Sequence, residues 1–299
     1  MIYTLTLNPA LDYVMKLSHF ESGSVLRTND EMLFAGGKGI NVSIVLANLG
    51  IKNTAMGFVG GFTGEIIENM LTDMGIDTDF VRVSKGFSRI NVKIKAETET
   101  EINAKGPSIN TKEVNELLSK LKKLKKDDIL VMAGSVPYGL SDIYTRIAEL
   151  MQEKEIMLIA DTTGSYLTDL LKYKPFLIKP NNFELGEIFG KALNTDEDIA
   201  HYAKKLTKMG AQNVYVSMGE YGAMLVSNQG DIIRLPAPKG QLVNSTGAGD
   251  SSVAGFVAGY LETGDLLEAM KLGVAAGSAT AFSDGLATKE EIYKLVNLF

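Results

Sequence analysis

The sequence predicts an α/β fold, in which helices cover both faces of a parallel sheet and a small second β-sheet is inserted. Strand-like and helix-like patterns alternate from residue 107 onward, which is typical of a parallel sheet with crossover helices. Glycine or polar residues follow directly after several of these strands. Residues 89–96 instead alternate polar and apolar side chains, which indicates a half-buried antiparallel strand.

The first elements are a strand and a helix. Residues 2–7 have a strand-like pattern and lead to the turn-forming pair Asn8-Pro9. Residues 36–49 follow a helical pattern that glycines open and Gly50 ends.

The regular part begins with a helix, because Asn110 and Glu113 form a capping-box pattern before apolar residues at helical spacing. Ligands in parallel sheets bind beyond the carboxyl ends of the strands, so the turns after them are candidate site segments. The predicted elements, in chain order, are a helix at 110–124, a strand at 129–132, a helix at 143–151, a strand at 156–160, a helix at 164–171, a strand at 176–178, a helix at 195–210, a strand at 214–217 and a helix at 253–260.

Segments on both sides of the first helix predict the second sheet. We expect a single domain over 1–299, with a β lid inserted into the α/β core and built from about 12–34 and 88–104. Its strands would be 89–96 with 101–104 as antiparallel partner, and further strands at 12–17 and 31–34.

The period of two places Arg89, Asn91 and Lys93 on one face of the lid. If that face looks into the cleft, it brings cationic and amide donors to a ligand. The alternative is an ordinary solvated face, which the spacing by itself favours.

Composition and charge exclude several classes of function. The net charge of −6 argues against binding to a nucleic-acid backbone, and the absence of cysteine excludes disulfides and thiolate chemistry. With only His19 and His201, acid–base catalysis falls mainly to carboxylates. No apolar run approaches the ~20 residues that span a membrane, and no signal-peptide pattern opens the chain. We therefore expect a cytoplasmic protein without membrane or nucleic-acid partners.

The segment Gly247-Ala248-Gly249-Asp250 precedes a helical stretch. Backbone N–H groups at a helix start bind anions, and phosphoryl transfer needs such a site for the charge on the transferred group. An aspartate at its edge would accept the proton of an attacking hydroxyl. The alternative is a glycine turn with Asp250 as N-cap, and the residues of this segment leave both open.

A second glycine-rich segment, Gly36-Gly37-Lys38-Gly39-Ile40-Asn41, also opens a helix. Lys38 and Asn41 share a face there and suit a phosphate and sugar hydroxyls, unless the segment is a simple turn. Neither glycine segment is a Walker A loop, and a dinucleotide fingerprint fails because Ser252 occupies its third glycine position.

Two further segments follow predicted strands. In the first, Lys179-Pro-Asn181 with Glu184, the asparagine and glutamate either cap a helix or place a carboxylate near hydrated Mg²⁺. In the second, Ser217 to Gly222 form a hairpin turn or a wall beside a nucleotide.

Taken together, these motifs resemble the ribokinase-like sugar kinases, in the branch named after bacterial phosphofructokinase B. Each motif is weak alone, but six in the family's order over essentially the whole chain favour the functional interpretation of the glycine segments. They are Asn8-Pro-Ala-Leu-Asp12, Gly36-Gly-Lys-Gly-Ile-Asn41, Gly134-Ser-Val-Pro137, Lys179-Pro-Asn with Glu184, Ser217-x-Gly with Gly222, and Gly247-Ala-Gly-Asp250.

The resemblance implies a three-layer α/β/α sandwich with a β lid, ATP as phosphoryl donor, Mg²⁺, and a homodimer formed through the lid. It also implies roles for individual residues. Asp250 would be the base, and the anion hole would be formed by Gly247, Ala248 and Gly249. The sugar substrate would be bound by Asp12, Gly37, Lys38, Asn41, Arg89, Asn91 and Asn103, with Arg89 on its phosphate. ATP would be bound by Lys179, Asn181, Ser217, Gly219, Glu220, Gly222 and Gly249, and Glu184 would hold the metal through water.

Within the family, Arg89-Ile-Asn-Val-Lys followed by Glu99-Thr-Glu-Ile-Asn103 and Gly106-Pro107 is similar to fructose-1-phosphate kinases. These phosphorylate the 6-hydroxyl of fructose 1-phosphate to give fructose 1,6-bisphosphate. Tagatose-6-phosphate kinases are the alternative within the family.

Two other classes are a non-catalytic sugar-phosphate sensor, against which the intact Asp250 argues, and an NAD-dependent oxidoreductase. In one respect the chain departs from the family. Asn244 stands where many members carry an aspartate associated with a monovalent cation, so a potassium requirement is not implied.

Overall fold

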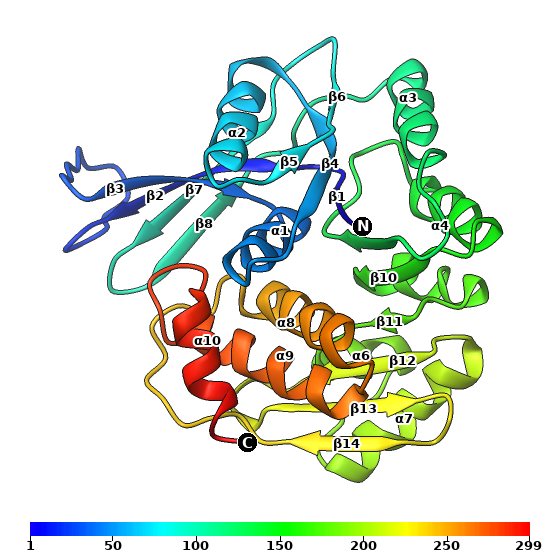
Figure 1. Ribbon diagram of the computed structural model, residues 1–299. Coiled ribbons are helices and arrows are strands. Elements are labelled where there is room, and N and C mark those ends of the chain that lie inside the picture. The colour runs from blue at the N-terminus through cyan, green and yellow to red at the C-terminus, as the bar shows by residue number, and fades with distance from the viewer.

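A computed structural model describes residues 1–299. It confirms the predicted α/β fold, with one large sheet, helices on both of its faces and a separate smaller sheet (Figure 1). The strands of the large sheet are β1 (Ile2–Thr6), β4 (Asn53–Val59), β5 (Asp77–Thr78), β6 (Val81–Arg82), β9 (Ile129–Ala133), β10 (Met157–Asp161), β11 (Leu177–Ile178), β12 (Asn213–Ser217), β13 (Ala223–Ser227) and β14 (Ile232–Leu235).

The large sheet runs in the order β14-β13-β12-β11-β10-β9-β1-β4-β5, with β6 paired to β4. Its pairs are parallel except at one edge, where β12, β13 and β14 form an antiparallel meander. In the middle of the sheet, β9 is apolar along its whole length because both faces are covered. All five of its residues are buried.

Ten α-helices and two short 3₁₀ turns accompany the strands. The α-helices are α1 (Lys38–Asn48), α2 (Gly61–Asp73), α3 (Thr111–Leu121), α4 (Ile143–Glu153), α5 (Gly164–Thr168), α6 (Asn182–Phe189), α7 (Asp196–Met209), α8 (Ala248–Thr263), α9 (Leu266–Ala281) and α10 (Lys289–Val296). The 3₁₀ turns are Leu171–Tyr173 and Gly219–Tyr221.

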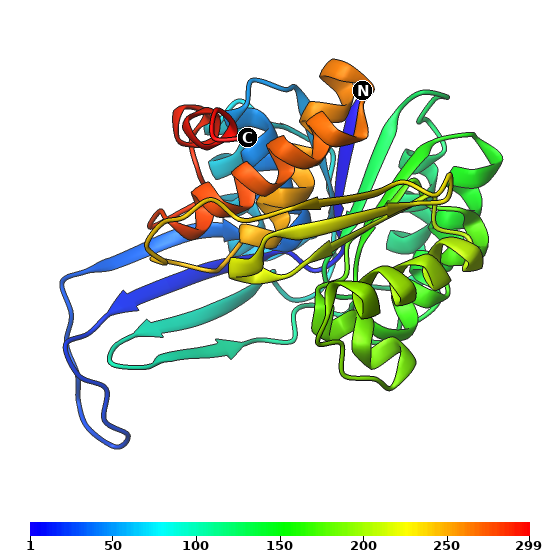
Figure 2. The same ribbon diagram turned by 90° about the horizontal axis from the view of Figure 1, so that it is seen from below.

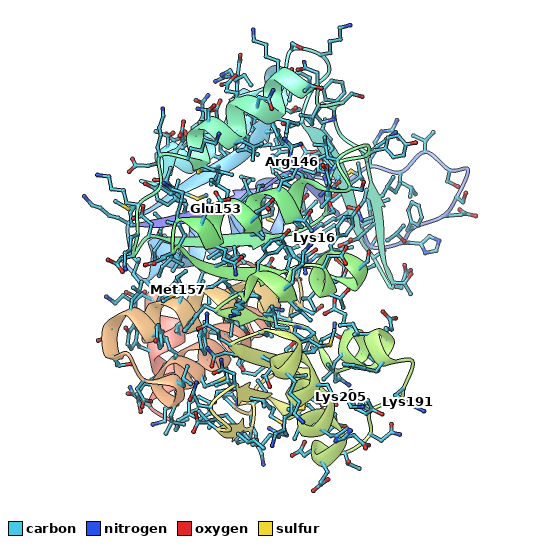
Figure 3. All side chains as sticks on the ribbon, turned by 90° about the vertical axis from the view of Figure 1, so that its right-hand side faces the viewer. Lys16, Arg146, Glu153, Met157, Lys191 and Lys205 are labelled. Carbon is cyan, nitrogen blue, oxygen red and sulfur yellow. The ribbon has the colours of Figure 1, made fainter.

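Two apolar cores separate the three layers. Along β9, Leu130 and Met132 point into a core shared with α3 to α7, whereas Ile129, Val131 and Ala133 point into a core shared with α1, α8, α9 and α10. The outer surface of the first helix layer carries charged side chains, among them Arg146 and Glu153 on α4 (Figure 3). α2 packs on a third, smaller core beside the second sheet.

The second sheet contains β2 (Ala10–Lys16), β3 (Glu31–Gly36), β7 (Arg89–Lys95) and β8 (Glu99–Asn103), in the order β3-β2-β7-β8. It projects from the body of the molecule (Figure 2). β7 and β8 pair antiparallel, as the alternating pattern predicts, but β2 and β7 pair in parallel.

Several predicted boundaries shift, and part of the fold was not predicted. The predicted strand 156–160 is displaced by one residue to Met157–Asp161, and this brings Asp161 to the end of β10. The predicted helix 164–171 is divided into α5 and a 3₁₀ turn. α8 begins at Ala248 instead of residue 253, so it includes most of the glycine segment. The sequence patterns predict no element for 51–88, which hold β4, α2, β5 and β6, or for 223–235 and 265–296, which hold β13, β14, α9 and α10.

No helix is long and apolar enough to cross a bilayer.

Candidate active site

The carboxyl ends of five adjacent parallel strands, β1, β9, β10, β11 and β12, define the edge at which the candidate site lies. α1 and α8 both begin at this edge. Their first turns meet there, because Asn41 of α1 donates a hydrogen bond to Asp250 of α8 over 2.7 Å. The fold thus brings residues 209 positions apart in the chain into contact.

The segment Gly247–Asp250, which we call the glycine loop, forms the start of α8. Gly247 is the N-cap in a left-handed conformation (φ 79°), and a Cβ there would lie 2.6 Å from the Leu286 side chain. No side chain caps the helix, so the N–H groups of Gly249 and Asp250 in its first turn remain for a ligand. Asp250 is the third residue of α8, which rules out the alternative that it is the N-cap.

Asp250 is a buried carboxylate, with a relative exposure of 6%. Burial and then the like charge of Asp161 raise its pKa to about 6, although Lys38, the Asn41 hydrogen bond and Lys179 act in the opposite direction. A carboxyl group with this pKa is ionised at neutral pH and can still accept a proton, which suits a general base.

Asp161, which the sequence analysis missed, joins two lysines beneath the glycine loop. It is 1% exposed, and its Oδ1 lies 3.3 Å from Lys38 Nζ and 3.5 Å from Lys179 Nζ. These two cations hold the pKa of Asp161 low although burial alone would raise it. Asp161 in turn raises the pKa of Lys38. The four groups Asp161, Asp250, Lys38 and Lys179 therefore form a compact, charge-balanced cluster.

A small cavity of about 370 Å³ opens beside this cluster. Of the residues predicted to bind the sugar, Gly37, Lys38 and Arg89 line it. The Arg89 guanidinium is half-buried and donates to the carbonyl oxygens of Asn8 (3.1 Å) and Ala104 (3.5 Å). Burial lowers its pKa, with Asp12 opposing the effect. The other lining residues are Thr6, Asn8, Gly134, Ser135, Val136, Thr162, Thr163 and Tyr166.

Asp12 organises the adjoining face of the second sheet. Its Oδ1 accepts a hydrogen bond from Asn91 over 2.9 Å, and its Oδ2 lies 3.0 Å from Lys93 Nζ. Both contacts are expected if these side chains share one face of the sheet. A Cβ on Gly36 would lie 2.6 Å from the Asp12 carboxyl carbon, so any larger residue there would displace this carboxylate. Asn103 is exposed on the edge strand β8, donates to Glu101 over 3.4 Å, and lines neither cavity.

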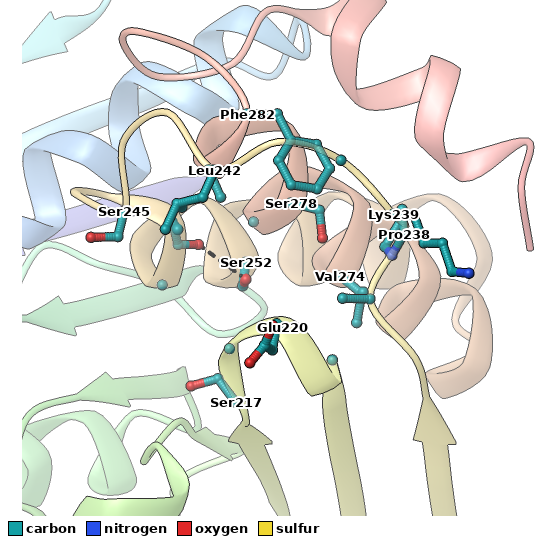
Figure 4. Close-up of a pocket in the computed structure, with 18 of the residues that line it drawn as sticks. Ser217, Glu220, Pro238, Lys239, Leu242, Ser245, Ser252, Val274, Ser278 and Phe282 are labelled. Carbon is teal, nitrogen blue, oxygen red and sulfur yellow. Dashed lines mark hydrogen bonds between the residues drawn. The ribbon is translucent and has the colours of Figure 1, made fainter.

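A larger cavity of about 900 Å³ lies beside the glycine loop (Figure 4). The predicted residues Ser217, Gly219, Glu220, Gly222 and Gly249 line it, together with Ala248. Its opposite wall comes from segments with no recognisable motif, namely residues 237–245 and 274–282, the second of which is α9 with its C-cap. They contribute Ala237, Pro238, Lys239, Gly240, Leu242, Ser245, Val274, Gly277, Ser278, Ala281 and Phe282.

The three residues predicted near the nucleotide after β11 differ in what they contact; they are Lys179, Asn181 and Glu184. Lys179 lies against the glycine loop, since a Cβ on Gly249 would be 3.1 Å from its Nζ. Asn181 and Glu184 form a capping box on α6, with bonds of 2.8 Å in both directions, and neither lines the small or the large cavity. The second Glu184 oxygen accepts no hydrogen bond, and the carboxylate is close enough to Lys38 to raise its pKa. That oxygen therefore fits a water-mediated contact to Mg²⁺, an ion that keeps several waters.

Asn244 participates in the turn before the glycine loop. Its side chain accepts a hydrogen bond from the Thr246 N–H (3.0 Å) and donates to the Asp284 carbonyl (3.2 Å). Both the nitrogen and the oxygen of this amide therefore form hydrogen bonds within the protein.

The residues that sequence reasoning missed differ in the signal they leave. Asp161 stands at the end of a buried apolar strand, followed by two threonines, and a charge in that position is a usable signal. Val274 and Ser278 on α9, and Phe282 at its C-cap, recur at helical spacing and look like ordinary core positions.

The chain is similar to known proteins over almost its whole length. The model of the pfkB family of carbohydrate kinases matches residues 5–292. A 1-phosphofructokinase of Bacillus subtilis is 46% identical, over 99% of this chain and 97% of its own. A D-tagatose-1-phosphate kinase of Bacillus licheniformis is 42% identical, over 96% and 94%. The crystal structure of phosphofructokinase-2 from Escherichia coli in complex with fructose-6-phosphate superposes with a TM-score of 0.93 at 30% identity, over 99% and 98%.

Proposed function

The chain belongs to the pfkB family of carbohydrate kinases, and we propose that it transfers the γ-phosphoryl group of ATP to the 6-hydroxyl of D-fructose 1-phosphate, giving fructose 1,6-bisphosphate. The observation that carries the proposal is that two cavities adjoin the glycine loop and the charged cluster beside it. Gly249 lines the larger one, and Asp250 lies close to Lys38, which lines the smaller one. A nucleotide in the first cavity and a sugar phosphate in the second would meet at this loop.

The reaction follows from this arrangement. Asp250 accepts the proton of the sugar 6-hydroxyl as its oxygen bonds to the γ-phosphorus, and the bond from that phosphorus to the β–γ bridging oxygen breaks. The first-turn N–H groups of α8 would stabilise the charge on the transferred group, and Lys38 and Lys179 would flank it. Mg²⁺, held near the nucleotide phosphates by Glu184 through water, would neutralise part of their charge when bound.

The orientation of the sugar is proposed from Arg89. It is the guanidinium in the lining of the small cavity, and one of its nitrogens, Nη2, donates no hydrogen bond within the protein. The 1-phosphate would lie there, leaving the far end of the sugar towards Asp250. Asp12, Asn41 and Asn91 would contact the hydroxyls between these two ends.

D-Tagatose 1-phosphate is the second candidate substrate, favoured by the 42% identity to a kinase of that name. It carries its phosphate on the same carbon as fructose 1-phosphate and differs from it at one stereocentre. A coupled ADP-release assay with fructose 1-phosphate, tagatose 1-phosphate, tagatose 6-phosphate, fructose 6-phosphate and unphosphorylated sugars tests the proposal. The highest kcat/KM for fructose 1-phosphate supports it; saturable binding without ADP release would indicate a sensor.

We also propose that the active form is a cytoplasmic homodimer assembled through the second sheet. Leu33 and Ile102, on its two edge strands, are exposed apolar residues on the face opposite Asp12 and Asn91. A matching face on a second copy would cover them. Sedimentation velocity of the purified protein decides between a dimer and a monomer.

Replacing Arg89 by alanine should mainly weaken recognition of the sugar phosphate. A hydrogen bond to a charged group is worth roughly 1.5–3 kcal/mol, so KM for the sugar phosphate should rise about 10- to 100-fold, while KM for ATP stays within about twofold. Steady-state kinetics with each substrate varied in turn measures both constants. Arg146→Ala, on the exposed surface of α4, is the matched control and should leave both unchanged. An unaltered sugar KM in Arg89→Ala would remove this residue from the site.

A further inference from the structure

We propose that Asp161 is a positioning residue for phosphoryl transfer, which holds Lys38 at the sugar cavity and Lys179 at the glycine loop through one shared carboxylate oxygen. The inference rests on the proposed function, since it assigns the two lysines to opposite sides of the transfer. Asp161 itself lines neither cavity.

The first argument is geometric. Three separate elements meet at Asp161, which is the last residue of β10. Lys38 is the first residue of α1, and Lys179 follows β11, the strand next to β10. Both Nζ atoms lie within 3.5 Å of the same oxygen, Oδ1. The position of this one oxygen therefore limits how far apart the two cations can be.

The second argument concerns what each lysine reaches. The Lys38 side chain is 39% exposed and lines the small cavity. The Lys179 side chain is 6% exposed and lies against Gly249, which lines the large cavity. Without the carboxylate, the two like charges would repel each other and the long, flexible side chains would lose their common anchor. One residue thus positions one cation for each substrate.

The third argument is that stability alone does not account for this cluster. The Oδ2 atom of Asp161 is buried and accepts no hydrogen bond. A buried ion pair often contributes little net stability, because desolvation offsets the attraction between the charges. An incompletely satisfied buried carboxylate is therefore better explained by what it holds in place.

Asp161 also contributes to the electrostatic environment of the base. The charged groups that face Asp250 are Asp161 from β10, Lys38 from α1 and Lys179 from the segment after β11, with Asn41 as hydrogen-bond donor. Neutralising Asp161 removes a negative charge near Asp250 and leaves the two lysines less compensated. Both changes favour ionised Asp250.

The experiment compares Asp161→Asn with Lys38→Met and Lys179→Met in the substrate assay. The asparagine keeps the shape of the side chain and loses its charge. We expect kcat to fall about 100-fold, the order of magnitude for losing one element of a preorganised anion site. KM should rise for both substrates in Asp161→Asn, for the sugar phosphate alone in Lys38→Met, and for ATP alone in Lys179→Met.

The pH profile gives a readout that a merely structural role would not move. The acidic limb of kcat/KM should move to lower pH in Asp161→Asn, because ionised Asp250 is favoured, and to higher pH in Lys38→Met, because a cation near Asp250 is lost. Asp128→Asn is the matched control. Its carboxylate, on the residue just before β9 at the opposite end of the sheet, binds the N-terminal ammonium (2.9 Å) and the Lys125 N–H (2.7 Å). This variant should lower Tm and leave the kinetics unchanged.

Three outcomes would overturn the proposal. They are wild-type kinetic constants in Asp161→Asn, a higher KM for only one substrate, or an acidic limb that does not move. If Asp161→Asn does not fold, the double-mutant cycle of Lys38→Met and Lys179→Met replaces it. If the fold-changes in kcat/KM of the two single variants simply multiply in the double variant, the proposal is overturned; a double variant that departs strongly from this product supports it. Wild-type turnover in the same assay reports on the proposed function, so the ratio of variant to wild type reports on Asp161 alone.

Discussion

Asp250→Asn should reduce kcat by roughly 10²–10⁴-fold, the range that a positioned general base contributes. The asparagine still accepts the hydrogen bond from Asn41 and fills the same space, but it cannot take a proton from the sugar hydroxyl. Binding of ATP should remain within about twofold, because the N–H groups of the glycine loop belong to the backbone. Steady-state kinetics and calorimetric titration with ATP measure the two effects. Near wild-type turnover would show that another group is the base.

The same variant should not be less stable. Folding raises the pKa of Asp250 to about 6 from an ordinary value of 3.8, so the folded state disfavours the ionised form. The resulting destabilisation is present above pH 6 and disappears as pH falls below 3.8. Asparagine removes this buried charge, and Tm at pH 7.5 should therefore stay constant or rise. A large fall in Tm would mean that Asp250 also has a structural role.

The wild-type pH profile offers an independent test of the base. Because Asp250 must be ionised to accept a proton, kcat/KM should be flat above pH 6 and fall about tenfold per pH unit below it. The profile should be recorded with a substrate range that separates kcat from KM, together with a pH-jump control for irreversible unfolding. An acidic limb near pH 4 would contradict the raised pKa.

Gly57→Ala should destabilise the protein by roughly 3 kcal/mol or more, the largest effect on stability that we expect from a single methyl group. Gly57 pairs with Thr6 between β4 and β1, at φ 143°, and a Cβ there would lie 1.9 Å from the Thr6 carbonyl oxygen. The backbone cannot yield without separating two neighbouring strands of the large sheet. The displaced end of β1 leads directly to Asn8 in the small cavity, so activity should fall as well.

Gly75→Ala is the matched control for this prediction. Gly75 also has a positive φ, 74°, but nothing lies within 4 Å of its ideal Cβ position. It should show only the cost of the left-handed conformation, about 1–2 kcal/mol. Urea unfolding of both variants measures the difference in their free energies of unfolding, provided that their m-values are equal. Equal losses in the two variants would mean that β1 and β4 can separate slightly without penalty.

The sequence predicts those parts of the fold in which the local pattern and the tertiary environment agree. The helix capped by Asn110 and Glu113 forms with the predicted capping box, and the helix capped by Thr195 ends at Gly210. The strand with a period of two forms β7, with its polar side chains on one face and its apolar side chains on the other, although none of its residues is exposed. Such signals are local and need no knowledge of the partners.

The remaining elements depend on partners that are distant in the chain. α8 and α9 are buried nearly all round, so their apolar residues show no amphipathic stripe. The parallel pairing of β2 with β7 joins segments about 79 residues apart, and no local pattern specifies it. The wall of residues 237–245 and α9 opposite Ser217 likewise arises only when α9 folds over the sheet.

In the candidate site, too, locally encoded residues could be predicted and contacts between distant segments could not. The glycine segments and the residues after the strands could be located from the sequence because small or polar residues interrupt apolar runs there. The link from Lys38 to Lys179 through Asp161 spans 141 positions and three elements, and it follows only from the order of the strands. For Glu184 the sequence motif was found, but the structure leaves two roles for it, because its capping box serves the helix whether or not the carboxylate also holds a metal.

The packing of α8 against α9 has a consequence for the timing of catalysis. A Cβ on Gly255 would lie 2.4 Å from the Leu272 carbonyl oxygen, and one on Gly259 would lie 2.9 Å from Ala269 Cα, so the two helices approach at backbone distance. A helix held in this way cannot slide or rotate when a nucleotide arrives. The orientation of the glycine-loop dipoles is therefore settled while the protein folds, and little reorganisation remains for the moment of phosphoryl transfer.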